Sequence, residues 1–160
     1  MHWEEKIDLI KKHYSTDEFE VPHVRRKEIL RKVESKFIAR PNSYYGLNEY
    51  TGPFKNWWAT IKTKEEKIIK RHYWEVLESI LQKDSFYWTA FEISGNVFLY
   101  KMKLAAIINL FSLGQSITRR LHIIELKYAF IISMDTSTAG GPSLKFAGES
   151  PIIENWLNDH

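Results

Sequence analysis

The spacing of hydrophobic residues changes once along this chain, near residue 85, and this change constrains the fold more than any motif does. Before it, apolar residues recur every three or four positions, as Ile7, Ile10 and Tyr14 do, which is the spacing of one helix face. From residue 86 to residue 93 the chain consists mainly of strand formers with a period of two. A run of helices followed by a run of strands predicts an α+β fold.

Three helices are expected in the amino-terminal half. The first covers residues 3–14, and the second lies between Pro22 and Pro41, with an apolar stripe that includes Val33 and Phe37. For the third, Thr63 followed by Glu66 matches a capping box. The apolar stripe of that third helix ends near Lys83 and comprises Ile69, Tyr73, Val76, Leu77 and Ile80.

Strands are expected to dominate the other half. The turn residues 94–96 predict a hairpin whose second strand begins at Val97, and residues 104–113 read as a helix that ends before Gly114. Residues 121–134 are either two strands turning near Lys127 or one long bulged strand. After a loop at 135–142, a short strand at 143–146 precedes a last helix, which Ser150 caps and Pro151 opens.

We therefore expect a single α+β domain over residues 1–160, a length that suits one domain with a sizeable core. The amino-terminal helices, in residues 1–83, would pack on a mainly antiparallel sheet of about five strands in residues 84–160. One helix would be inserted between the strands, and another would close the chain.

The composition restricts the chemistry and the location. The chain contains no cysteine, which excludes thiol catalysis, thiolate metal sites and a disulfide scaffold and is typical of a reducing cytoplasm. The longest apolar run, residues 121–134, contains Glu125 and Lys127 and is shorter than the roughly 20 residues of a membrane helix. The first residues lack the features of a signal peptide. We expect a cytoplasmic protein without a membrane span.

No motif indicates a catalytic centre. None of the six histidines has a metal-binding spacing, and the nearest candidates, His122 and Glu125, would point to opposite faces of a strand. Asp135 and Ser137 precede two glycines, but no lysine follows these as a phosphate loop requires, so a hairpin loop is the simpler interpretation. We expect no catalytic residue, no metal ion and no cofactor, although carboxylates paired only by the fold stay possible.

Two segments could form a binding surface. Residues 41–61 are rich in aromatic residues, which could cover the core, serve as exposed anchors for a partner, or line a substrate pocket. On the basic second helix, Arg25, Lys32 and Lys36 can share one face. Such a face is solvated, or it contacts nucleic acid or an acidic protein.

The second half of the chain shows a specific order of patterns. It comprises a helix with Trp74, Leu77 and Leu81, a strand at 88–93, the turn Gly95-Asn96, a strand with Leu99-Tyr100, a helix at 104–110, and a strand at 128–132 before a loop of small residues. Over residues 70–158 this order resembles the SUKH superfamily, which is similar to the fungal cell-wall-assembly regulator domain and is widespread among bacterial immunity proteins.

The resemblance implies a non-catalytic α+β domain that binds and neutralises a cognate polymorphic toxin. Affinity would come from buried aromatic residues and encounter rate from complementary charge. The candidate contacts are Tyr44, Tyr45, Tyr50, Trp57 and Trp58, with Asp135 and Glu149 as acidic contacts. The alternatives are an enzyme of another type with a pocket lined by residues 44–58, and a nucleic-acid-binding domain that uses the basic helix 24–40.

Overall fold

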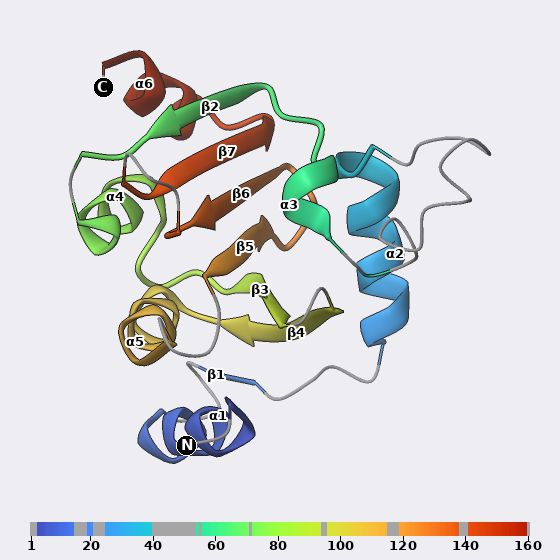
Figure 1. The fold of residues 1–160 in the computed structure, drawn as a ribbon, viewed down its shortest axis with the longest axis vertical. Coiled ribbons are helices and arrows are strands. Elements are labelled where there is room, and N and C mark those ends of the chain that lie inside the picture. The colour runs from blue at the N-terminus through green and yellow to red at the C-terminus, as the bar shows by residue number, and fades with distance from the viewer. Residues whose placement is uncertain are drawn as a thin grey trace.

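The computed structural model describes residues 3–14, 19–20, 25–39, 54, 56–70, 72–93, 96–114, 119–137 and 141–159. In this part of the chain, seven strands form one antiparallel sheet in the order β1-β4-β3-β5-β6-β7-β2 (Figure 1). The strands are β1 (Phe19–Glu20), β2 (Glu65–Ile68), β3 (Tyr87–Ile93), β4 (Asn96–Met102), β5 (Arg120–Glu125), β6 (Phe130–Asp135) and β7 (Ser143–Gly148). The helices are α1 (Trp3–His13), α2 (Arg26–Phe37), α3 (Trp57–Thr60), α4 (Tyr73–Ile80), α5 (Leu104–Gly114) and α6 (Pro151–Asp159). The α+β prediction with a mainly antiparallel sheet is confirmed.

Helices cover both faces of this sheet. Tyr87 and Phe91 of β3 pack with α1, α4, α5 and α6 on the first face, whereas Trp88 and Ala90 pack with α2 and α3 on the second. Figure 1 shows α4 and α5 on one side of the sheet and α2 and α3 on the other. Because successive strand residues point to opposite faces, a sheet buried on both sides needs nearly continuous apolar strands. This explains the long apolar run at residues 121–134.

That run forms two strands, which settles the alternative left open by its periodicity. Strand β5 ends at Glu125, and β6 begins at Phe130. The turn between them places Tyr128 at a positive φ of 61°. One oxygen of Glu125, Oε1, accepts hydrogen bonds from the backbone N–H groups of Lys127 (2.9 Å) and Ala129 (3.1 Å). The side chain of Glu125 thus closes the turn.

The predicted third helix is wrong in its first half. Residues 65–68 form β2, which pairs with β7, and the helix itself begins only at Tyr73 and ends at Ile80. The hydroxyl of Thr63 donates to the carbonyl of Ile61 instead of capping a helix. A capping-box pattern is a local signal, and here the backbone pairing with an unfilled sheet edge outweighs it. The apolar stripe is genuine from Tyr73 onward.

The remaining predicted elements are present. The hairpin forms β3 and β4, the inserted helix is α5, and the closing helix is α6, where the backbone N–H of Ile153 donates to the hydroxyl of Ser150 at 3.3 Å. None of the helices in the described ranges is both long and apolar enough to cross a bilayer.

The first testable prediction concerns Gly148, the last residue of β7, whose φ is +94°. A Cβ atom there would lie 2.3 Å from the carbonyl oxygen of Ala129 and 2.8 Å from the Cα of Phe130. We expect Gly148→Ala to lower the free energy of unfolding by at least about 2 kcal/mol in urea denaturation, because it combines backbone strain with a clash. The substitution Glu149→Ala at the next, exposed position is the control. A wild-type stability for Gly148→Ala would contradict this close packing.

Candidate functional site

The second face of the sheet carries a set of polar side chains at one end. Arg120 of β5 lies opposite Asp135 of β6, which lies opposite Ser143 of β7. In the neighbouring row, His122 lies opposite Ser133, and Ser133 lies opposite Lys145. Alternate residues of a strand share a face and directly paired residues are adjacent, so these side chains come together. On β2, Glu66 lies opposite Lys145 and accepts a hydrogen bond from the hydroxyl of Ser143 at 3.1 Å. We call the following set the polar network: Glu66, Glu92, Arg120, His122, Ser133, Asp135, Ser143 and Lys145.

The centre of the polar network is a carboxylate–imidazole–hydroxyl chain. His122 Nδ1 lies 2.6 Å from the hydroxyl oxygen of Ser133, and His122 Nε2 lies 3.2 Å from Glu92 Oε2. Serine hydrolases use these three chemical groups. Here His122 and Ser133 are each 0% exposed and Glu92 is 7% exposed. No substrate can reach the hydroxyl of Ser133 in this arrangement. The three hydrogen-bonded side chains therefore connect strands instead of presenting a nucleophile.

Helix α3 covers the hydrogen-bonded side chains of Glu92, His122 and Ser133. The backbone N–H of Trp57 donates to Glu92 Oε1 at 2.6 Å, and the Trp57 ring packs edge-on against His122 with 5.5 Å between the centroids. The indole N–H of Trp57 donates to Glu34 Oε2 of α2 at 2.8 Å. Lys145 donates to the carbonyl of Trp58 at 2.8 Å, and its ammonium lies 4.3 Å from the Trp58 ring centroid. The polar network therefore holds α3 on the sheet.

The outer members of the network are also paired inside the protein. Arg120 Nε donates to Asp135 Oδ2 at 3.0 Å, and Ser137 donates its backbone N–H to Asp135 Oδ1 at 2.8 Å. Burial alone would raise the pKa of Asp135, but the hydrogen bonds from Ser137 and Arg120 hold it below its usual range. Burial lowers the pKa of Lys145. Asp135 is 3% exposed, so its carboxylate does not offer the partner contact expected from the sequence.

The other sequence candidates lie in different places. Trp57 (0% exposed) and Trp58 (9% exposed) belong to the core and are not exposed anchors, whereas Glu149 is exposed. Tyr44, Tyr45 and Tyr50 lie outside the described residues.

The basic residues of α2 have acidic and aromatic neighbours. Arg25 and Lys32 both lie within 4.0 Å of Glu28, and the Lys32 ammonium lies 5.8 Å from the Tyr128 ring centroid. Lys36 donates to the carbonyl of Tyr128. The structure thus brings this face against the β5–β6 turn.

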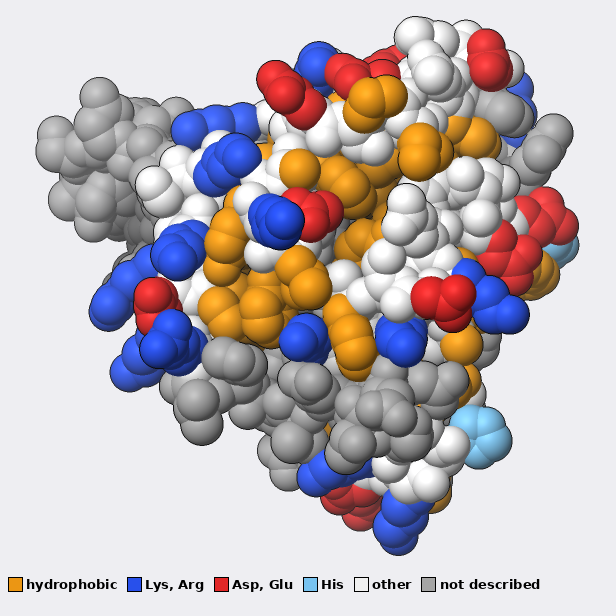
Figure 2. Space-filling model, turned by 180° about the vertical axis from the view of Figure 1, so that it is seen from behind, with side chains coloured by type: hydrophobic (Ala, Val, Ile, Leu, Met, Phe, Trp, Pro, Cys, Tyr) orange, Lys and Arg blue, Asp and Glu red, His pale blue; other side chains and the backbone are white. Residues whose placement is uncertain are grey.

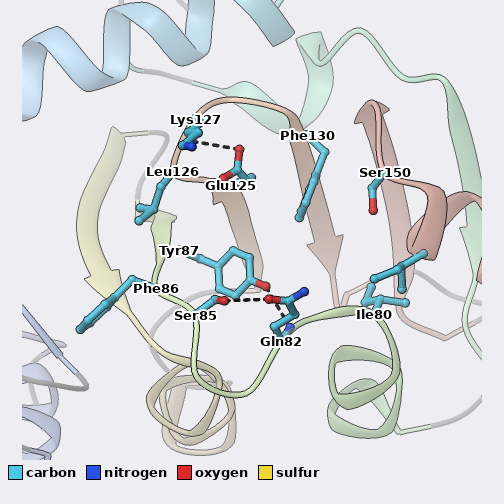
Figure 3. Close-up of a pocket in the computed structure, with 11 residues that line it drawn as sticks. Ile80, Gln82, Ser85, Phe86, Tyr87, Glu125, Leu126, Lys127, Phe130 and Ser150 are labelled. Carbon is cyan, nitrogen blue, oxygen red and sulfur yellow. Dashed lines mark hydrogen bonds between the residues drawn. The ribbon is translucent and has the colours of Figure 1, made fainter.

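An open pocket of about 430 Å³ lies where the end of α4, the β5–β6 turn and the start of α6 meet (Figure 3). Figure 3 shows the Tyr87 side chain in the middle, with Gln82 on one side and Glu125 and Phe130 on the other. The Tyr87 hydroxyl accepts a hydrogen bond from the backbone N–H of Gln82 at 2.9 Å, and burial raises the pKa of Tyr87. The lining is mainly apolar and aromatic and consists of Ile80, Gln82, Ser85, Phe86, Tyr87, Glu125, Leu126, Lys127, Phe130, Ser150 and Ile152.

One lysine side chain lines the pocket, and two others lie beside a residue that lines it. The ammonium groups of Lys101 and Lys103 lie 4.9 Å and 5.2 Å from the ring centroid of Phe86, which lines the pocket, and Lys127 lines it directly. Figure 2 shows hydrophobic side chains gathered around a hollow on this side of the molecule, with Lys and Arg side chains around them. We call the pocket and these three lysines the lysine-rimmed pocket.

Sequence reasoning missed this pocket because its lining comes from segments distant in sequence. One signal was available: Lys101 and Lys103 occupy alternate positions directly after the predicted strand at 97–100, where an extended backbone would point both side chains to one face.

Among the residues described, no group of three or more His, Asp or Glu side chains is arranged to hold a metal ion. Compared with protein-family models, curated proteins and solved structures, the chain shows no match.

The polar network predicts a specific dependence of stability on pH. Burial would raise the pKa of Glu92, but hydrogen bonding and charge from His122, with Arg120, lower it overall. A lowered pKa in the folded state means that Glu92 stabilises the fold above its ordinary pKa, and that this contribution is lost as the pH falls through the folded-state pKa. We expect Glu92→Gln to be less stable than wild type by about 1–3 kcal/mol at pH 7. The difference should shrink between about pH 5 and pH 3.

Urea denaturation at a series of pH values measures this effect, with Glu149→Gln as the matched change at an exposed position. A constant stability difference between wild type and Glu92→Gln across the acid range would show that the Glu92 carboxylate does not carry the stabilisation.

Proposed function

We propose that this protein is a non-catalytic protein-binding domain. The observation that carries the proposal is the contrast between two sites. The acid–base groups of Glu92, His122 and Ser133 are sealed by Trp57, whereas the lysine-rimmed pocket is open and mainly apolar. Interface hot spots cluster where a side chain of one partner fills a pocket that becomes desolvated on binding, and an accessible apolar pocket can serve in this way.

The pocket can supply useful affinity through one inserted side chain. Fully burying a Leu or Phe side chain contributes about 1.5–3 kcal/mol, and a side chain in a desolvated pocket at the centre of an interface often dominates binding. Lysines around the pocket would raise the rate of encounter with an oppositely charged surface. Both effects serve recognition, and neither needs a reacting group.

The specific form that we propose is an immunity protein that neutralises a cognate toxin by direct contact in the cytoplasm. The support for this form is the resemblance of residues 70–158 to the SUKH superfamily, together with the order of elements: α4, the β3–β4 hairpin, α5 and the later strands. The toxin would be a protein produced beside this one.

An enzyme is the second candidate, and the chain Glu92–His122–Ser133 is the observation that favours it. Acyl transfer at Ser133 would require α3 to leave the sheet, because the hydroxyl is otherwise unreachable. Such an opening would break the hydrogen bonds of Trp57 to Glu92 and Glu34.

The proposal predicts that Ile152→Glu disrupts partner binding. Ile152 lines the pocket and is 52% exposed, so a charged side chain there changes the surface without emptying the core. Leu9→Glu on α1 is the matched control, because Leu9 is 47% exposed, does not line the pocket and gives the same change of charge.

The measurement is co-purification after co-expression with the product of the adjacent gene, together with protection of the host cell. Wild type and Leu9→Glu should co-purify with that product in a one-to-one complex and protect the cell, and Ile152→Glu should lose both properties. If wild type neither binds nor protects, the immunity function is wrong.

A further inference from the structure

Strand β2 lies at one edge of the sheet, beyond β7 (Figure 1). On its inner side it pairs with β7 from Glu65 to Ile68, and the backbone N–H of Ile69 donates to the carbonyl of Pro142 at 2.7 Å. In the part of the chain that the structure describes, no strand pairs with its outer side. An edge strand of this kind offers backbone N–H and C=O groups to another strand.

The alternation of the ladder decides which backbone groups face the open edge. In an antiparallel pair, the residues that exchange hydrogen bonds with the neighbouring strand alternate with residues that do not. Ile69 bonds to β7, so Lys67 and Glu65 do the same. Glu66 and Ile68 therefore turn their N–H and C=O groups outward, and Lys70 is the next alternate residue in this row.

The side chains of this outward row are exposed on the second face of the sheet. Ser143, which belongs to the polar network, lies opposite Ile68. Ile68 is 55% exposed, and Glu66 and Lys70 are exposed as well. Glu66 Oε1 accepts the hydrogen bond of the Ser143 hydroxyl, which holds the carboxylate on this face. Along the edge, the row thus reads negative, apolar, positive.

Helix α6 lies against β2 without covering this row. The ammonium of Lys67 donates to the carbonyl of Leu157, and Lys64 forms an ion pair with Glu154. Lys67 lies opposite Leu144 of β7, whose side chain belongs to the core of the first face. The helix is therefore on the first face, and the outward row on the second face stays accessible.

We propose that two copies of this chain associate through the outer edge of β2, paired antiparallel about a two-fold axis at Ile68. A row that reads negative, apolar, positive is complementary to itself when reversed. Ile68 then lies opposite Ile68 of the second copy, and Glu66 lies opposite Lys70 of the second copy on both sides of the axis. Such an interface is isologous, and both kinds of cross-strand pair are stabilising. The inference goes beyond the proposed function and does not depend on it.

The charges on β2 disfavour the neighbouring registers. An axis at Glu66 would place two glutamates directly opposite each other, and an axis at Lys67 would do the same with two lysines. Like charges directly opposite each other destabilise a strand pair. An axis at Ile69 would place Ile68 opposite Lys70, where it meets a charge instead of an apolar side chain. The register centred on Ile68 is the one in which the exposed side chains match.

The test is sedimentation equilibrium of the full-length protein from about 5 to about 500 μM at about 50 mM salt, because a small interface gives weak association. The average mass of wild type should rise from that of a monomer toward that of a dimer. Lys70→Glu and Glu66→Lys should each weaken self-association at least about tenfold, since like charges then meet. The matched controls, Lys12→Glu and Asp8→Lys, change exposed positions of α1 near the opposite edge (Figure 1) and should associate as wild type does.

Mixing the two edge variants separates a lost ion pair from a damaged fold. The outward row of Lys70→Glu carries two carboxylates, and that of Glu66→Lys carries two ammonium groups. In an equimolar mixture each carboxylate faces an ammonium, so the mixture should form a heterodimer although neither variant associates alone. The double variant Glu66→Lys/Lys70→Glu should regain self-association within about threefold of wild type.

Hydrogen exchange locates the contact on the same samples. The backbone N–H groups of Glu66, Ile68 and Lys70 should be protected more strongly at high protein concentration than at low concentration. Protection that is equal at all concentrations would show that another part of the same chain covers the edge, and would overturn the inference. A wild type that stays monomeric, edge variants that associate normally, an equal loss in the α1 controls, or a mixture that forms no heterodimer would also overturn it.

Discussion

The sheet is buried on both faces, so every buried polar side chain on its strands must be accommodated inside the protein. The rest of the structure depends on how this is done. Strands with continuous apolar character leave little room for polar side chains, and each buried polar group must find a hydrogen-bond partner inside the protein. The second face meets this demand through the contact between Glu92, His122 and Ser133, to which α3 adds the backbone N–H of Trp57. A four-residue helix, too short to be stable alone, is thereby fixed over the sheet.

The same packing separates the buried polar side chains from the accessible pocket. Glu92, His122 and Lys145 are used inside the protein, where they join strands and hold α3. The accessible hollow at the ends of β3, β5 and β6 is lined mainly by apolar and aromatic side chains. The binding that we propose for this hollow would need only shape, apolar contact and charge. The turn after β5 links the two regions, because Lys32 and Lys36 of α2 contact Tyr128 in that turn while Leu126 and Lys127 line the pocket.

The fold was largely predictable from the sequence, and the site was not. Periodicity gave the two classes of element and their order, because it reports local burial directly. It failed at residues 65–68, where pairing with β7 outweighs a helical pattern. The network of Glu92, His122 and Ser133 spans three strands, and the pocket joins Ile80 to Ile152. Contacts of this kind depend on strand order and register, which a single sequence does not encode in any local pattern.

Ser133 and His122 serve the fold, and we propose that the molecule acts by binding. The most direct measurement treats the native protein with a fluorophosphonate, which reacts covalently with activated serine hydroxyls, and maps adducts by peptide mass spectrometry. We expect no adduct on Ser133 in the native state, because its hydroxyl is buried. A stoichiometric adduct on Ser133 that disappears in His122→Asn would contradict it, because it would show that α3 opens onto a reactive centre.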